Sequence, residues 1–228
     1  MLTHTENSNA YVAPPHLTNS PYAFQSARGP AWLFTPDSRE KSFGPSEEIF
    51  GEGEPVDCIY EVVQGTVRSY RMLGDGRRKI DAFRLRGDIF GFETGEERAS
   101  CAEAIGDVRV RFARRSTFAR DRPVDGAGWE LWAIITAELQ RVQKHALLLA
   151  KSAQERVAGF LIEMSRRLDH PDALELPMSR QDIADHLGLT IETVSRTLTQ
   201  FEAKGIIARP MMRQITLLDP TALRLMSG

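Results

Sequence analysis

The sequence SRQDIADHLGLTIETVSRTLTQFEAKG, residues 179–205, carries the clearest structural pattern in the chain. It predicts two short helices joined by a tight turn at Gly188, because glycine reaches positive φ at little cost. Ser179, with Asp182 three residues later, is suited to cap the first helix, and Thr190 is suited to cap the second. The pattern is typical of a helix-turn-helix, and the apolar positions expected on its inner faces are Ile183, Ala184, Leu187, Val194, Leu198 and Phe201.

The outer face of the second predicted helix carries side chains suited to reading DNA. Arg196 can donate two hydrogen bonds to guanine, and Glu192, one turn earlier, can accept one from cytosine. Ile191 offers a methyl contact to thymine, and Ser195 can adapt to several partners. Since recognition helices present such residues to base edges, these four are the expected base contacts. The alternative is a solvated face with a Glu192–Arg196 pair worth only about 0.3 kcal/mol.

These residues also carry a resemblance to a known family. DIADHLGLTIETVSRTL, residues 182–198, resembles the helix-turn-helix of the CRP/FNR superfamily of bacterial transcription regulators. The E-x-x-S-R group at Glu192, Ser195 and Arg196 resembles the FNR/FixK branch rather than the cyclic-AMP branch. The resemblance covers roughly residue 40 to the end. It implies an α+β fold with an N-terminal antiparallel β-roll of the cyclic-nucleotide-binding kind, a long dimerisation helix and a C-terminal winged helix-turn-helix.

The resulting domain expectation has four parts. Residues 1–30, rich in Asn, Ser, Thr, Pro and Ala, are expected to form a disordered tail, because they lack the apolar pattern needed to bury surface. Residues 31–127 are expected to form the β-roll and residues 128–157 the dimerisation helix. Residues 158–228 are expected to form the DNA-binding domain.

Composition limits the class of protein. A chain of 228 residues with 42% hydrophobic and 26% charged residues is typical of a soluble protein with two cores. Its two cysteines, Cys58 and Cys101, give no disulfide framework and no CxxC zinc pair. No apolar run approaches the roughly 20 residues of a membrane span, and no signal peptide is evident. A cytoplasmic protein without a membrane partner is therefore expected.

The charge of the chain is unusual for a DNA-binding protein. The net charge is −2, and residues 171–228 hold six Lys or Arg against seven Asp or Glu. The basic surface typical of nucleic-acid binders is therefore weak. Affinity must depend on where the cations lie and on two copies acting together. The residues expected at the DNA backbone are Arg180, Thr190, Thr193, Arg209 and Arg213.

Between Phe43 and Phe118, short β-rich runs alternate with glycine turns, predicted at Gln64–Gly65 and at Gly74–Gly76. This spacing favours a small antiparallel barrel or roll, with a plain β-sandwich as the alternative. The glycines of G-x-G-E-P at residues 51–55 and G-D-I-F-G at residues 87–91 resemble the cyclic-nucleotide-binding roll.

Nucleotide binding itself is not expected. Members of the superfamily that bind a nucleotide place a Glu after the second glycine motif and a Ser or Thr after an Arg. Here Phe92 follows Gly91, and Ala99 follows Arg98. Three nearby carboxylates would also repel a phosphate, those of Glu93, Glu96 and Glu97.

Haem and iron–sulfur chemistry are not expected either. Cys58, Cys101, His145 and His186 form no matched ligand pair in the sequence, and the N-terminal tail has no cysteine for a cluster. The expectation is therefore no cofactor and no metal, with the roll as a scaffold.

A long helix is predicted from about Trp129 to Ala158, because apolar residues recur there at spacings of three and four. The interpretation favoured here is a parallel homodimer through this stripe. The alternative is a helix buried within one chain against the roll, and Trp129, Trp132 and Ile134, at the start of the helix, are expected to pack on the roll. The residues expected at the dimer interface are Leu139, Val142, Ala146, Leu149 and Ala153.

Beyond the helix-turn-helix, residues 206–208 and 214–218 predict two strands of a wing around a turn at Pro210. Asp219 and Pro220 are suited to begin a last helix. A two-fold dimer would place two recognition helices in successive major grooves about 34 Å apart, on an inverted repeat.

The resemblance implies a regulator, most like activators of low-oxygen or nitrogen-fixation genes, that binds half-sites resembling TTGAT. RNA polymerase is an expected partner, with the turn at residues 74–78 as its contact. The alternative is a sensor whose DNA binding requires a small ligand in the roll. An enzyme is not expected, because the sequence holds no nucleophile and base grouping and no phosphate loop.

Overall fold

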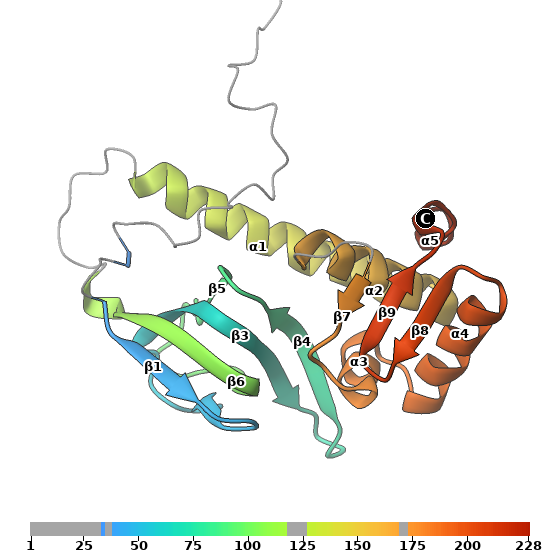
Figure 1. The fold of residues 1–228 in the computed structure, drawn as a ribbon. Helices are drawn as coiled ribbons and strands as arrows, with labels where there is room; N and C mark the ends of the chain where they lie inside the picture. Colours follow the sequence, from blue (N-terminus) through green and yellow to red (C-terminus); the bar gives the residue numbers. More distant parts are fainter. Residues whose placement is uncertain (1–32, 35–37, 118–126, 169–172) are drawn as a thin grey trace, which may run out of the picture.

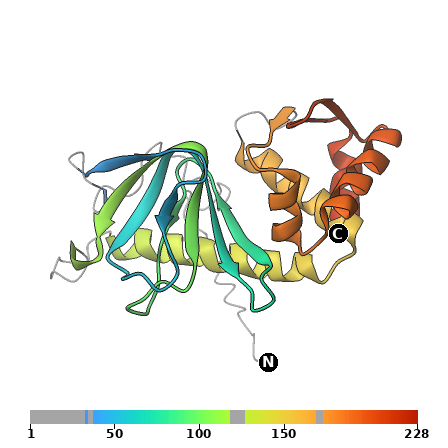
Figure 2. The same cartoon turned by 90° about the horizontal axis from the view of Figure 1, so that it is seen from below.

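The structure, a computed structural model, describes residues 33–34, 38–117, 127–168 and 173–228. A β-sheet unit lies at one end and a mostly helical unit at the other, and one long helix runs along both (Figures 1 and 2). This arrangement confirms the predicted α+β fold class. The tail predicted at residues 1–30 lies outside the described part of the chain.

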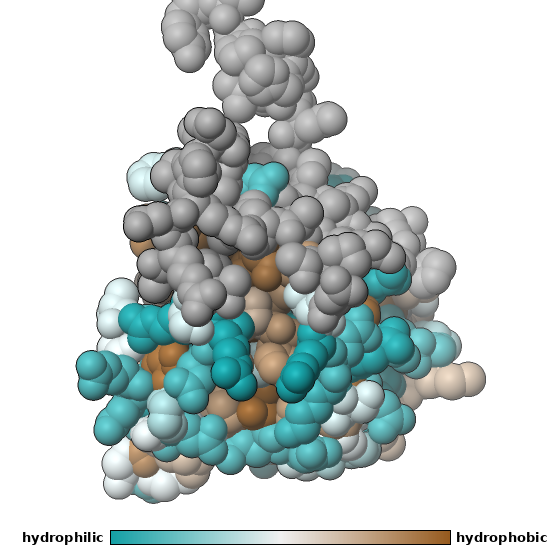
Figure 3. Space-filling view, turned by 90° about the vertical axis from the view of Figure 1, so that its left-hand side faces the viewer, coloured by the Kyte–Doolittle hydropathy of each residue, from teal (hydrophilic) through white to brown (hydrophobic). Residues whose placement is uncertain are grey.

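The N-terminal unit is a six-stranded antiparallel sheet folded over its own core. Its two long strands, β3 (Cys58–Met72) and β6 (Cys101–Arg114), pair along most of their length. Figure 3 shows the molecule from the left-hand side of Figure 1, and apolar side chains lie there in the middle of the visible surface between hydrophilic ones. The shorter strands are β1 (Glu40–Phe43), β2 (Glu48–Phe50), β4 (Arg78–Arg84) and β5 (Ile89–Phe90).

The turn predicted at Gln64–Gly65 is wrong, because β3 continues through these residues with a bulge. Gly65 has φ +84°, and a Cβ there would lie 2.4 Å from the carbonyl oxygen of Asp107 in β6. Glycine therefore permits a close approach of the two strands, and the bulge increases the bend that curls the sheet. The turn predicted at Gly74–Gly76 is confirmed, with Gly76 at φ +82°.

The single helix predicted from Trp129 to Ala158 is also wrong, since two helices occupy this region. Helix α1 (Ala127–Leu149) ends before residues 150–152, and α2 (Ala153–Arg167) begins after them. Ser152 accepts a hydrogen bond from the amide of Glu155, whose side chain accepts one from the amide of Ser152. This capping box starts a new helix although the apolar spacing continues. Ala153 is therefore the first residue of α2 and does not lie in α1.

The C-terminal unit contains the helix-turn-helix and a three-stranded sheet in the order β7-β9-β8. The turn of the wing lies at residues 212–213 and not at Pro210, which lies within β8 at a register shift. Proline has no amide hydrogen and is tolerated at such an irregularity. The elements are β7 (Ala173–Glu175), α3 (Arg180–Leu187), α4 (Ile191–Ala203), β8 (Ile207–Met211), β9 (Gln214–Leu217) and α5 (Pro220–Ser227).

Candidate nucleic-acid interface

The caps and the turn hold α3 and α4 as the sequence predicts. The Ser179 side chain accepts from the amide of Asp182, and the carboxylate of Asp182 accepts from the amide of Ser179, so a capping box begins α3. Gly188 ends α3 with φ 62°, and the Thr190 hydroxyl accepts from the amide of Thr193 to begin α4. The inner-face residues are buried, as predicted: Ile183, Ala184, Leu187, Val194, Leu198 and Phe201.

The outer face of α4 is open to a ligand. Glu192 and Arg196 are exposed, Ile191 is 37% exposed, and Ser195 is half-buried. Hydrogen bonds from its own amide and from the Thr190 side chain, with the charge of Arg196, lower the pKa of Glu192. Glu192 is therefore a carboxylate near neutral pH and an acceptor for a base amino group. The four expected base contacts share one surface.

The expected backbone contacts surround this face. Arg180 donates to the carbonyl oxygen of Met212 at 3.3 Å, which links the start of α3 to the tip of the wing. Arg213 is exposed at the same tip. The hydroxyls of Thr190 and Thr193 lie 3.1 Å apart at the start of α4.

Arg209 has a partner that the sequence did not indicate. Its Nε donates to Oε2 of Glu202 at 3.0 Å, and its Nη2 donates to the Thr199 hydroxyl at 3.2 Å. These bonds fasten the wing strand β8 to α4. Arg209 therefore lies beside the recognition helix with part of its charge compensated.

The stripe on α1 is partly exposed. Leu139 is 55% and Val142 is 58% exposed, and Ala146 is also exposed, whereas Leu149 is half-buried. Trp132 is 61% exposed, so the prediction that it packs on the roll is wrong. Ile134 is half-buried, and the side chain of Trp129 lies outside the described part. Trp132, Ile135 and Leu147 extend the apolar exposure along α1.

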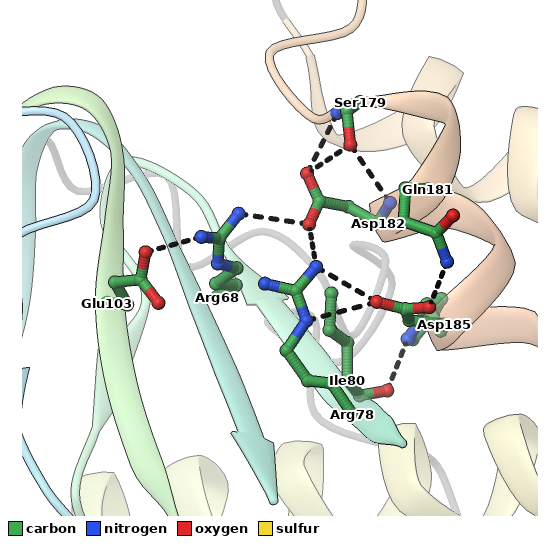
Figure 4. A network of polar contacts seen from close by, with 9 residues as sticks. Arg68, Arg78, Ile80, Glu103, Ser179, Gln181, Asp182 and Asp185 are labelled. Carbon is green, nitrogen blue, oxygen red and sulfur yellow. Dashed lines mark hydrogen bonds and ion pairs between the residues drawn. The ribbon is translucent and has the colours of Figure 1, made fainter. Parts of the chain in front are cut away.

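An ionic network joins the C-terminal unit to the roll, and sequence reasoning missed it. Arg68 of β3 and Arg78 of β4 both donate to Oδ1 of Asp182, at 2.9 and 2.6 Å (Figure 4). Arg78 also donates to Oδ2 of Asp185, from Nε at 3.0 Å and from Nη2 at 2.9 Å. We call these four residues the interdomain latch. Spacing had assigned Asp182 only to a cap, and no local pattern shows which distant strand faces a helix.

Electrostatics keep the carboxylate of Asp182 charged. Burial alone would raise the pKa of Asp182, but hydrogen bonds from Ser179 and the charges of Arg68 and Arg78 hold it below its ordinary value. Arg68 also pairs with the carboxylate of Glu103 on β6. Asp182 therefore serves two structures at once, the start of α3 and the junction with the roll.

A histidine lies at the centre of the same junction. His186 of α3 is buried, and its Nδ1 lies 3.1 Å from the carbonyl oxygen of Ile80 in β4. Ile80 and Phe83 of β4 belong to the same apolar core as α2, α3 and α4. The two units therefore share a core as well as the latch.

A cavity of about 410 Å³ lies between the roll, α1 and α2.

Arg98 is the cation that the sequence places nearest to a possible phosphate site in the roll, and it is only 3% exposed. Its guanidinium donates to the carbonyl oxygens of Gly91 and Cys58 at 2.8 and 2.6 Å and stacks 4.1 Å from the ring centroid of Phe50. This group is already hydrogen-bonded and does not extend toward a ligand.

The described residues contain neither a metal site nor a membrane-spanning helix. No cluster of three or more His, Cys, Asp or Glu in that part of the chain could hold a metal ion. No helix there has both the length and the apolar character needed to span a bilayer.

Two family models match the chain. The Crp-like helix-turn-helix domain matches residues 155–226, and the cyclic nucleotide-binding domain matches residues 40–120. These matches correspond to the two units of the fold. The second match shows that the roll is related in sequence to cyclic nucleotide-binding domains. Which ligand the roll can bind depends on the residues around Arg98.

Similar proteins are known in several bacteria. The nitrogen fixation regulation protein FixK of Azorhizobium caulinodans is 48% identical over 209 residues, which cover 89% of this chain and 84% of that protein. FixK of Rhizobium meliloti is 42% identical over 185 residues, with 80% and 84% covered. The solved structure of FixK2 from Bradyrhizobium japonicum is 45% identical, has a TM-score of 0.77, and covers 84% of this chain and 98% of its own.

Proposed function

Because this chain belongs to the CRP/FNR family of transcription regulators, in its FixK branch, we propose that it binds an inverted repeat resembling TTGAT-N4-ATCAA as a homodimer. The observation that carries this proposal is the exposed outer face of α4, held by two caps and a glycine turn. The roll docks against α3 on the other side and leaves this face open.

Each base contact has a chemical assignment. Arg196 reads the guanine of the half-site through O6 and N7, and Glu192 accepts from the N4 amino group of the paired cytosine. Ile191 contacts a thymine methyl group, and Ser195 adapts to the neighbouring base. Backbone phosphates are held by Arg180, Thr190, Thr193, Arg209 and Arg213, which position the helix without specifying sequence.

The homodimer forms through α1. Exposed apolar side chains at Leu139 and Val142 favour a second copy of the same helix, because burying them removes apolar surface from water. Ala146 and Leu149 continue this seam, and it ends there because α1 ends at Leu149. Ala153 is at most a flanking contact, since it begins α2.

The regulated genes are those of nitrogen fixation or low-oxygen respiration. The names of the FixK relatives support the assignment to nitrogen fixation. Activation requires a contact with RNA polymerase, for which we assign the exposed turn around Asp75 and Arg77. The protein acts by binding and has no catalytic role in this proposal.

A second candidate function rests on the cavity of about 410 Å³, which reaches from the roll to α1 and α2. A small ligand there could gate DNA binding by changing how these elements pack. The internal hydrogen bonds of Arg98 favour the ungated regulator.

The experiment is a titration of the purified, aerobically prepared full chain without added ligand. Duplexes carrying TTGAT-N4-ATCAA and a scrambled control are compared at a stated salt concentration, because DNA affinity depends steeply on salt. Specific binding of a dimer supports the ungated regulator. Equal affinity for both duplexes would contradict it and favour the gated form.

A further inference from the structure

We infer that Arg68 and Arg78 are positioning residues for DNA binding: through the interdomain latch they fix the orientation of α3 and so the spacing between the two half-sites. This inference rests on the proposed function and names the residues that set its geometry. A dimer needs its two α4 helices at a fixed separation and angle, because each added base pair moves a half-site by about 3.4 Å and about a tenth of a turn.

The covalent connection alone does not fix this angle. The chain joins α1 to the C-terminal unit through residues 150–152, where helical hydrogen bonding is interrupted. Such breaks are where hinge rotation occurs. A rotation there would carry α2, α3 and α4 together. It would change the angle between the outer faces of the two α4 helices in the dimer.

One end of α3 is tied to this break. Arg156 of α2 donates from Nε to the carbonyl oxygen of Lys151 at 2.8 Å and from Nη1 to that of Leu187 at 3.0 Å. The end of α3 is therefore bound to the connection itself. The contact of His186 with the carbonyl oxygen of Ile80 lies in the same last turn of α3, so these attachments still permit the start of α3 to move.

The latch supplies the second attachment, near the start of α3 and on the roll (Figure 4). The side chain of Asp182 is 4% exposed, and those of Arg68 and Arg78 are 13% and 23% exposed. Water screens such pairs little, and loss of one partner leaves an uncompensated buried charge, so these pairs resist separation more than surface pairs do. Two attachments at opposite ends fix the direction of α3, and α4 follows through the Gly188 turn.

The latch faces away from the DNA contacts. Asp182 and Asp185 point toward β3 and β4, while Glu192 and Arg196 remain exposed on α4. The latch can therefore be weakened without removing a base contact.

The experiment compares Arg78→Ala and Asp185→Asn with the unchanged full chain. Anisotropy titrations use inverted repeats whose spacer is shortened or lengthened by one or two base pairs, and a duplex with a single half-site. Each variant should lose about tenfold of its preference for the best spacer, as expected for coupled buried pairs. Affinity for the single half-site should stay within about twofold.

Arg77→Ala is the matched control. It removes the same charge one position away, but Arg77 pairs with Asp75 inside the exposed turn and does not contact α3. It should keep the spacer preference. The double variant of Arg78 and Asp185 should be no worse than Arg78→Ala, because that single variant already lacks the contact with Asp185 as well as the one with Asp182.

Three outcomes would overturn the inference. Unchanged spacer preference in both variants would show that other contacts set the angle. Tighter binding of the variants to the repeat would show that the latch opposes DNA binding. A second measurement needs no DNA: amide hydrogen exchange across α3 should be faster in Arg78→Ala than in Arg77→Ala, and equal rates would also overturn it. If the unchanged chain binds no half-site, the proposed function fails, and the exchange rates still decide the latch.

Discussion

The imidazole ring of His186 in α3 stacks on that of His145 in α1, with ring centroids 4.3 Å apart and planes 24° from parallel. Burial, followed by the charge of His145, lowers the pKa of His186 to about 3. Burial and the charge of Lys79 lower the pKa of His145. Both rings are therefore neutral in the folded protein near neutral pH, and the junction of α1, α3 and β4 depends on that neutrality.

This relationship predicts an acid-sensitive stability. The unfolded chain protonates His186 near pH 6.5, whereas the folded chain does so only near pH 3, so the unfolded state binds more protons between these values. The free energy of unfolding should be fully retained above about pH 6.5 and fall as the pH drops, by up to about 1.4 kcal/mol per pH unit for one proton. Denaturant unfolding at several pH values gives the free energy of unfolding of the unchanged chain and of His186→Gln. Between about pH 3 and 6.5 this free energy should fall less steeply with decreasing pH in the variant. Equal slopes would contradict the buried neutral imidazole.

Base discrimination should depend on Arg196. Arg196→Ala removes the two hydrogen bonds to guanine and should reduce discrimination at that base pair by about 1–3 kcal/mol. Arg213→Ala, at the tip of the wing, is the control, because loss of a phosphate contact weakens all sequences alike. Titrations with the wild-type half-site and a G-to-A half-site measure the difference. Unchanged discrimination in Arg196→Ala would refute the assignment.

Dimerisation should be sensitive to the exposed stripe of α1. Val142→Glu places a carboxylate where 58% of the side chain is exposed in one chain, so the fold should tolerate it. Buried against a second copy, an unpaired charge costs several kcal/mol, and the dimer should dissociate. Sedimentation velocity would detect the monomer. Gln143→Glu, at the neighbouring exposed position, should remain dimeric.

Gly65 should be the glycine of the roll least tolerant of a side chain. Gly65→Ala combines a positive φ with a Cβ 2.4 Å from the Asp107 carbonyl oxygen and should destabilise the fold by more than about 2 kcal/mol. Gly76→Ala has a similar φ, but no atom lies within 4 Å of its Cβ, so only the backbone strain of about 1–2 kcal/mol should appear. Thermal unfolding of both variants gives the comparison. Equal losses would mean that β6 moves away at little cost.

The proposed polymerase contact should be separable from DNA binding at Asp75 and Arg77. These side chains pair with each other in the exposed turn, whereas Arg78, which the sequence places in the same turn, belongs to the latch. Replacing both Asp75 and Arg77 by Ala should lower transcription in vitro and leave the titration curve for the repeat unchanged. Loss of both functions together would contradict a polymerase role.

Local signals in the sequence predicted the structure of the helix-turn-helix well. Ser179, Gly188 and Thr190 act through contacts no more than three residues away, or through backbone conformation, so their roles are visible in the sequence itself. The same reasoning predicts which side of α4 is buried, because helical periodicity determines which residues share a face. The β-roll was recognised by its glycines, although Gly65 proved to be a bulge.

One local signal was missed in the sequence, whereas the contacts that orient the outer face of α4 depend on tertiary structure and could not be seen there at all. The break at Ser152 was encoded by a local capping box, but the continuing apolar spacing of α1 and α2 concealed it. The pairing of Arg78 with Asp185 joins residues 107 positions apart, and only the packing of β4 against α3 brings them together. A charge in the sequence shows that a partner is needed once it is buried, but not which partner, because burial depends on the whole fold.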